Sequence, residues 1–115
     1  MIFVFGSNLS GIHGAGAAKY ALEKHGAEWG VGEGLTGQSY ALPTKGLNIV
    51  DMTFDEVDES IVTFVNFAKD NPTLTFHLTP VGCGLAGHRK SDVWNTLKRE
   101  GLSSNVLLTS TWVTD

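Results

Sequence analysis

Residues 73–100 read TLTFHLTPVGCGLAGHRKSDVWNTLKRE, and this stretch decides the fold. Residues 73–81 are rich in β-branched and aromatic side chains and predict a strand. Residues 91–100 predict a helix that ends at Gly101. Between the two lie three glycines at the spacing G-x-G-x-x-G, namely Gly82, Gly84 and Gly87. A strand, a glycine-rich turn and a helix in this order are typical of a parallel α/β sheet.

The rest of the chain continues this alternation of strands and helices. We expect strands at 2–5, 39–45 and 105–113, a short extended piece at 47–51, helices at 15–25 and 53–70, and an irregular glycine-rich segment at 27–38. Thr53 and Glu56 form a capping box at the start of the second helix. Pro43 should end its strand or leave it at a sheet edge. The pattern predicts one domain over 1–115, a three-layer α/β/α fold with a mixed, largely parallel sheet.

The amino-acid composition argues against several classes of partner and site. The net charge is −4 and the eight Lys and Arg residues form no cluster, so we expect no nucleic-acid binding through bulk electrostatics. The single Cys83 excludes an intrachain disulfide, and the histidines lack zinc-ligand spacing, so no metal is expected. No apolar run is long enough for a membrane span or a signal peptide. We therefore expect a cytoplasmic protein with no membrane partner.

The glycine spacing alone fits either an anion-binding turn or a merely tight turn. A dinucleotide-binding domain also needs an acidic residue at the end of the next strand. This chain has Thr109–Thr111 there, with Asp115 as its last residue, so we expect no NAD cofactor. A second glycine-rich loop, GIHGAGAA at 11–18, precedes the first helix. Both loops should meet at the carboxyl edge of the sheet, where their backbone N–H groups suit a diphosphate.

Three motifs together resemble the macrodomain family, the fold that binds ADP-ribose. They are GSNLSGIHGAGAAKYAL at 6–22, PVGCGLAG at 80–87 and YALPTK at 40–45. The last two resemble the branch that contains terminal ADP-ribose protein glycohydrolases and antitoxins that remove ADP-ribose from DNA. The resemblance implies a minimal macrodomain-like fold that binds ADP-ribose or a related nucleotide.

The resemblance also implies roles for individual residues. Asn8 would contact the distal ribose, and Lys45 would be the catalytic residue. Judged from its chemistry alone, Lys45 could bind a phosphate or ribose as a cation, attack the anomeric carbon as a free amine, or be a solvated lysine after a strand. Backbone N–H groups would bind the pyrophosphate from the first loop at Gly14, Gly16 and Ala17. The second loop would close over the pyrophosphate and ribose with Gly82, Cys83, Gly84, Leu85, Ala86 and Gly87.

The sequence departs from the family in ways that leave the substrate open. It lacks the family's first strand and adenine-binding Asp, so we expect an altered adenine site. Ala86 replaces an Asp of the protein-acting hydrolases, and GLNIV at 46–50 replaces an aromatic and basic stretch of the DNA-acting members. ADP-ribosylated protein and ADP-ribosylated nucleic acid both remain candidate substrates. We expect a protein that binds ADP-ribose or a derivative and hydrolyses an ADP-ribosyl linkage with Lys45. The alternatives are a non-catalytic module that recognises or sequesters the nucleotide and an interaction protein of the same fold that binds no nucleotide.

Three further side chains are candidate ligand contacts. His13 and His88 lie in or beside the glycine-rich loops and could contact phosphate or transfer a proton. The alternative for each is an exposed loop histidine. Trp112 near the end of the last expected strand could stack on a base, and the alternative is that it packs against the core.

Overall fold

The computed structural model describes residues 1–113, so Thr114 and Asp115 lie outside the described residues. Its elements, in chain order, are β1 Ile2–Asn8, α1 Gly16–Lys24, β2 Gly34–Thr36, β3 Ser39–Lys45, the 3-10 turn η1 Leu47–Ile49, α2 Phe54–Asp70, β4 Phe76–Leu78, α3 Lys90–Glu100, β5 Val106–Leu108 and the 3-10 turn η2 Ser110–Trp112.

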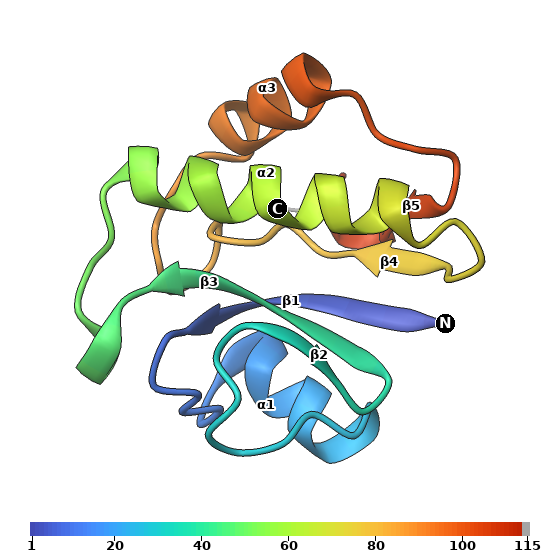
Figure 1. Cartoon of the computed structure of the whole chain (residues 1–115). Helices are drawn as coiled ribbons and strands as arrows, with labels where there is room; N and C mark the ends of the chain where they lie inside the picture. The colour runs from blue at the N-terminus through green and yellow to red at the C-terminus, as the bar shows by residue number, and fades with distance from the viewer. Residues whose placement is uncertain (114–115) are drawn as a thin grey trace.

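The five strands form one mostly parallel sheet in the order β2-β3-β1-β4-β5. Only β2 runs antiparallel, at the edge beside β3. Helix α1 covers one face of the sheet, and α2 and α3 cover the other (Figure 1). The predicted α/β/α architecture with a mixed, largely parallel sheet is therefore confirmed. None of the helices in residues 1–113 is long and apolar enough to cross a membrane.

The alternation of side chains along β1 divides the core into two parts. Ile2 and Val4 point toward α2 and α3 and join the larger cluster of buried residues. Phe5 points the other way, into a smaller cluster with Ala18 and Ala21 of α1. Because β1 is central and buried on both faces, its sequence is a nearly continuous apolar run.

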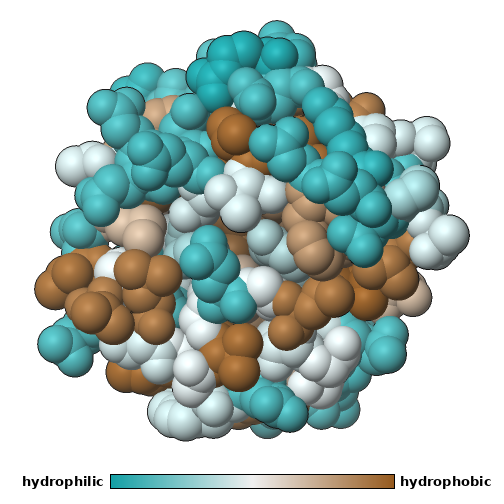
Figure 2. Space-filling model, viewed as in Figure 1, coloured by the Kyte–Doolittle hydropathy of each residue, from teal (hydrophilic) through white to brown (hydrophobic). Residues whose placement is uncertain are grey.

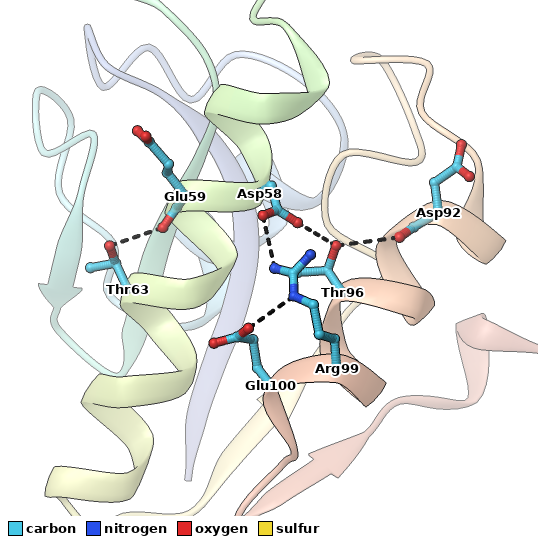
Figure 3. Close-up of polar contacts among 7 residues, drawn as sticks. All are labelled: Asp58, Glu59, Thr63, Asp92, Thr96, Arg99 and Glu100. Atoms are coloured by element: carbon cyan, nitrogen blue, oxygen red, sulfur yellow. Dashed lines mark hydrogen bonds and ion pairs between the residues drawn. The ribbon is translucent and has the colours of Figure 1, made fainter.

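Two sets of polar contacts stabilise the helices that cover the larger core. The predicted capping box is confirmed, because the Thr53 and Glu56 side chains each bond the other residue's backbone N–H. Between α2 and α3, the Thr96 hydroxyl donates to Oδ1 of Asp58 at 2.5 Å (Figure 3). Nη2 of Arg99 lies 2.8 Å from Oδ2 of the same Asp58 carboxylate. These contacts hold α3 in register against α2.

Three expectations about the minor elements are wrong. Residues 34–36, expected in an irregular loop, form the edge strand β2, which pairing with β3 stabilises against local propensity. Residues 47–49, expected to be extended, form a 3-10 turn. The last strand ends at Leu108 instead of continuing to 113. Pro43 does not end β3; β2 pairs only with 39–41, so the missing N–H of Pro43 leaves no ladder bond unmade.

Candidate ligand-binding cleft

A cleft of about 940 Å³ lies at the carboxyl ends of the parallel strands. It is bordered by the loop after β1, the end of β3, the glycine-rich loop after β4 and the residues after β5. Ligands of open α/β sheets bind at this edge, because the loops that follow neighbouring strands lead to opposite faces of the sheet and leave a crevice between them.

The first wall of the cleft is the loop from β1 to α1. The amide of Asn8 closes this loop: Nδ2 donates to the carbonyl of Ile12 at 2.8 Å, and the Ile12 N–H donates to Oδ1 at 3.0 Å. Helix α1 then begins at Gly16 without a side-chain cap and without an acidic residue in its first turn. Its first N–H groups therefore carry the positive end of the helix dipole toward the cleft.

The second wall is the glycine-rich loop at 80–88. The His88 N–H donates to the carbonyl of Gly82 at 2.8 Å and closes the loop, and within it the Gly87 N–H donates to the carbonyl of Gly84 at 3.0 Å in a tight turn. Gly82 has φ 76° and so occupies the left-handed region that favours glycine. Within residues 1–113, the N–H groups of Gly84, Leu85 and Ala86 have no hydrogen-bond acceptor. A Cβ on Gly84 would meet no atom within 4 Å, so its backbone is open to a ligand.

Lys45 lies between these walls, at the end of β3. Its backbone pairs with Asn8 just past a register shift at the end of β1. Nζ of Lys45 lies 3.6 Å from Oδ1 of Asp51, and 21% of the Lys45 side chain is exposed. Lys45 and Asn8, whose amide closes the first loop, both line the cleft.

The charge of the cleft contrasts with the charge of the chain. The chain has twelve Asp and Glu residues, yet no carboxylate of the described residues lines the cleft. Two lysines do, Lys45 and Lys90. Nζ of Lys90 donates to the carbonyl of Thr111 at 2.9 Å, which places this ammonium near the end of β5. Among the described residues, lysines are therefore the only charged side chains that line the cleft, in an acidic protein.

Ten of the residues singled out from the sequence do line one cleft. They are Asn8, Gly14, Gly16, Ala17, Lys45, Gly82, Cys83, Gly84, Leu85 and Ala86. The motifs are more than seventy residues apart at their extremes, and the parallel sheet brings them to one edge. Four others do not line it: Gly87, His13, His88 and Trp112.

The two histidines and the tryptophan pack elsewhere. His13 is 1% exposed, and its Nε2 lies 3.1 Å from the carbonyls of both Glu28 and Val31, so the alternative of an exposed loop histidine is wrong. His88 packs edge-on against Phe54. Trp112 donates from Nε1 to the carbonyl of Leu78 at 2.8 Å and packs against the larger core cluster.

Cys83 is part of the cleft wall but is poorly suited to act as a nucleophile. Its Sγ donates to the carbonyl of Val81 at 3.5 Å. Burial raises the pKa of the thiol, which favours the unreactive protonated form. No group of three or more His, Cys, Asp or Glu residues in the described chain could hold a metal ion.

The structure adds lining residues that sequence reasoning missed. Phe3 of β1 and Tyr20 of α1 form an aromatic part of the cleft wall, with ring centroids 5.5 Å apart. Thr79 and Thr109 follow β4 and β5, and Lys90 begins α3. The sequence analysis missed Thr79 and Thr109 because it placed them inside strands at 73–81 and 105–113, whereas β4 and β5 end directly before them. Tyr20 lies mid-helix, where no local pattern separates a cleft residue from an exposed one.

Comparisons with known proteins support the fold alone. No family model matches the chain, and no curated protein matches it. A solved structure of a protein of unknown function from Bacteroides thetaiotaomicron superposes with a TM-score of 0.62 at 16% identity, covering 94% of this chain and 85% of that one. A crystal structure of a structural genomics target, also from Bacteroides thetaiotaomicron, gives a TM-score of 0.58 at 17% identity, covering 94% of this chain and 87% of that one.

Proposed function

We propose that the chain is a macrodomain-like protein that binds ADP-ribose or a close derivative in the cleft. The observation that carries this proposal is the composition of the cleft: two lysines and no carboxylate line it, in a chain of net charge −4. A cleft lined by lysine but by no carboxylate suits an anionic ligand, because no negative charge of the described lining opposes it. The motif resemblance selects ADP-ribose among such anions.

The pyrophosphate would lie between the two loops. The uncapped start of α1 would donate from one side, and the N–H groups of Gly84, Leu85 and Ala86 from the other. The distal ribose would lie toward Asn8 and Lys45, as the resemblance implies. The adenosine would then extend along the sheet toward Phe3 and Tyr20.

Hydrolysis of an ADP-ribosyl linkage is the second candidate function, and Lys45 is the observation that favours it. Its backbone pairs with Asn8, and both residues line the cleft, at the end assigned to the distal ribose. There it would stabilise the charge that develops as the linkage breaks. Among residues 1–113, the lining includes no histidine or carboxylate to activate water, so turnover would depend on Lys45. Without turnover, the protein is a module that recognises or sequesters the nucleotide.

Calorimetric titration with ADP-ribose tests the binding proposal. We expect a micromolar Kd, roughly −7 to −8 kcal/mol. Gly84→Val should abolish binding without unfolding the domain, because the new side chain has room in the apo cleft but occupies the ligand's place. Lys98→Ala, at an exposed site on α3, is the control. No heat with ADP-ribose at millimolar concentration would refute the proposal.

A release assay separates the two candidate functions. The protein is incubated with ADP-ribosylated protein, ADP-ribosylated DNA and O-acetyl-ADP-ribose, and free ADP-ribose is followed by mass spectrometry. Release from any of them supports the hydrolase. Tight binding of ADP-ribose without release from all three supports the binding module.

A further inference from the structure

Residues 46–50, which connect β3 to the segment before α2, present apolar side chains to solvent next to the cleft; we call them the apolar loop. Leu47 is 63% exposed, Ile49 42% and Val50 58%. In Figure 2 a hydrophobic cluster lies at the side of the molecule where Figure 1 places the connection from β3 to α2. Exposed apolar groups that gather in this way mark interaction sites more often than scattered ones do.

Several hydrogen bonds hold the backbone of the apolar loop in one turn. The Gly46 N–H donates to the Val50 carbonyl at 2.9 Å, and the Ile49 N–H donates to the Gly46 carbonyl at 3.2 Å. The Asn48 N–H donates to Oγ of Ser10 at 2.8 Å, which ties the loop to the first wall of the cleft. A β-bridge between Lys45 and Asp51 closes its base. The apolar side chains are therefore presented by a fixed turn.

This turn retains backbone strain. Asn48 has φ 56° and Ile49 has φ 59°, both in the left-handed region. Asn tolerates that region, but a β-branched residue there is a genuine outlier. Strain of this kind persists where the surrounding structure over-determines it, and it gathers at binding sites. Ile49 also lines the cleft, so the strained residue joins the loop to the ligand site.

The charges around the loop decide which kind of partner fits it. Between residues 25 and 68 the only basic residue is Lys45. The residues that follow the loop include exposed acidic side chains at Asp51, Asp55 and Glu56. A nucleic acid needs basic contacts for its phosphates and would be repelled here. A polypeptide with apolar and basic side chains is complementary to this surface.

We propose that the apolar loop docks the polypeptide that carries the ADP-ribosyl group, so that the substrate or ligand class is ADP-ribosylated protein and not ADP-ribosylated nucleic acid. This inference rests on the proposed function, because the distal ribose at Lys45 would present its attached macromolecule to the loop. Leu47 and Val50 would contact apolar side chains of the carrier, and Asp51 its basic ones.

Competition titrations against fluorescent ADP-ribose test this inference. The probes are free ADP-ribose, a synthetic peptide with one ADP-ribosylated serine flanked by leucine and lysine, and a single-stranded oligonucleotide with one ADP-ribosylated thymine. The variant is Leu47→Ser/Val50→Ser, which spares every residue that lines the cleft. The matched control is Leu107→Ser/Val113→Ser, which replaces one exposed leucine and one exposed valine elsewhere.

We expect wild type to bind the peptide about tenfold more tightly than free ADP-ribose, because two half-exposed side chains become buried. The loop variant should lose this gain and bind free ADP-ribose as wild type does, whereas the control variant should keep the gain. Equal affinity for peptide and free ADP-ribose, or tighter binding of the oligonucleotide, would overturn the inference but leave the proposed function intact. Failure of free ADP-ribose to bind would refute both. A dimer in sedimentation analysis that the loop variant dissociates would assign the loop to a second copy of the chain and would also overturn the inference.

Discussion

Lys45 and Asp51 are joined twice, by a β-bridge between their backbones and by an ion pair of 3.6 Å between their side chains. The two residues bracket the apolar loop, and Lys45 also lines the cleft. The Asp51 side chain is 92% exposed, whereas that of Lys45 is 21% exposed. Most of the Lys45 side chain is therefore buried, whereas its partner lies in solvent, where the ion pair is screened.

Replacing Lys45 with Ala separates a binding role from a catalytic one. As a binding residue, Lys45 should contribute about 1–2 kcal/mol to the affinity for ADP-ribose, the scale of a charge-assisted hydrogen bond. As a catalytic residue, its loss should abolish release of ADP-ribose and leave affinity nearly unchanged, since its contact would matter in the transition state. Calorimetry and the release assay measure the two effects. Lys98→Ala is the matched lysine control, and a Lys45→Ala protein unchanged in both assays would exclude Lys45 from function.

Replacing Asp51 with Asn should strengthen anion binding. The carboxylate competes with a bound phosphate for the Lys45 ammonium, so its removal should lower the Kd for ADP-ribose about two- to threefold at low salt. Salt should reduce the difference, because Asp51 is exposed and its field is screened. The free energy of unfolding should change by less than about 1 kcal/mol, as for other exposed ion pairs. Weaker binding in Asp51→Asn would indicate instead that the carboxylate positions Lys45 for the ligand.

The long helices and central strands of this fold could be predicted from the sequence, whereas the short edge strand and some cleft residues could not. Apolar runs identified β1 and β3, and the capping box at Thr53 placed the start of α2 to the residue, because these signals are local. Strand β2 escaped prediction because its three residues are held by pairing with β3 rather than by their own propensity. The loop motifs predicted ten of the cleft residues, whereas Lys90 and Tyr20 come to the cleft only through the packing of their helices.

Tyr20 should contact the base of the nucleotide. It lies one helical turn after Gly16, about 6 Å along the same face of α1, so a ligand phosphate at the helix start would place its base near the ring. Tyr20→Ala should weaken ADP-ribose binding about five- to tenfold, at the low end of the range for base stacking because the side chain is half exposed. Tyr20→Phe should bind as wild type. Ribose 5-phosphate, which lacks a base, should not distinguish the three proteins, and if it did the assigned orientation of the ligand would be wrong.

The contact between Thr96 and Asp58 should stabilise the fold in a pH-dependent way (Figure 3). The hydrogen bond from Thr96, and then the contacts with Arg99, lower the pKa of Asp58 below its ordinary value of 3.8. A lowered folded-state pKa adds stability above the unfolded-state pKa, and this stability is lost as the pH falls through the folded-state value. Thr96→Val should therefore cost about 1 kcal/mol near neutral pH and less below about pH 4. Urea unfolding at both pH values measures this. Thr63→Val, which removes only a bond to the Glu59 backbone carbonyl, should show no such pH dependence, and equal costs for Thr96→Val at both pH values would contradict the assignment.

Replacing the strained Ile49 should make the protein more stable. Its φ of 59° costs of order 1–3 kcal/mol for a β-branched residue, whereas Asn occupies that region readily. Ile49 is 42% exposed, so the apolar burial lost with its side chain is small. Ile49→Asn should therefore raise the free energy of unfolding by about 0.5–1 kcal/mol and the Tm by a few degrees. Leu47→Asn is the matched control, because Leu47 is a more exposed residue of the same turn without a positive φ, and it should bring no gain. A stabilised Ile49→Asn protein that binds the ADP-ribosylated peptide less tightly would show that the strain is retained for function, whereas a destabilised one would show that Ile49 holds the turn together.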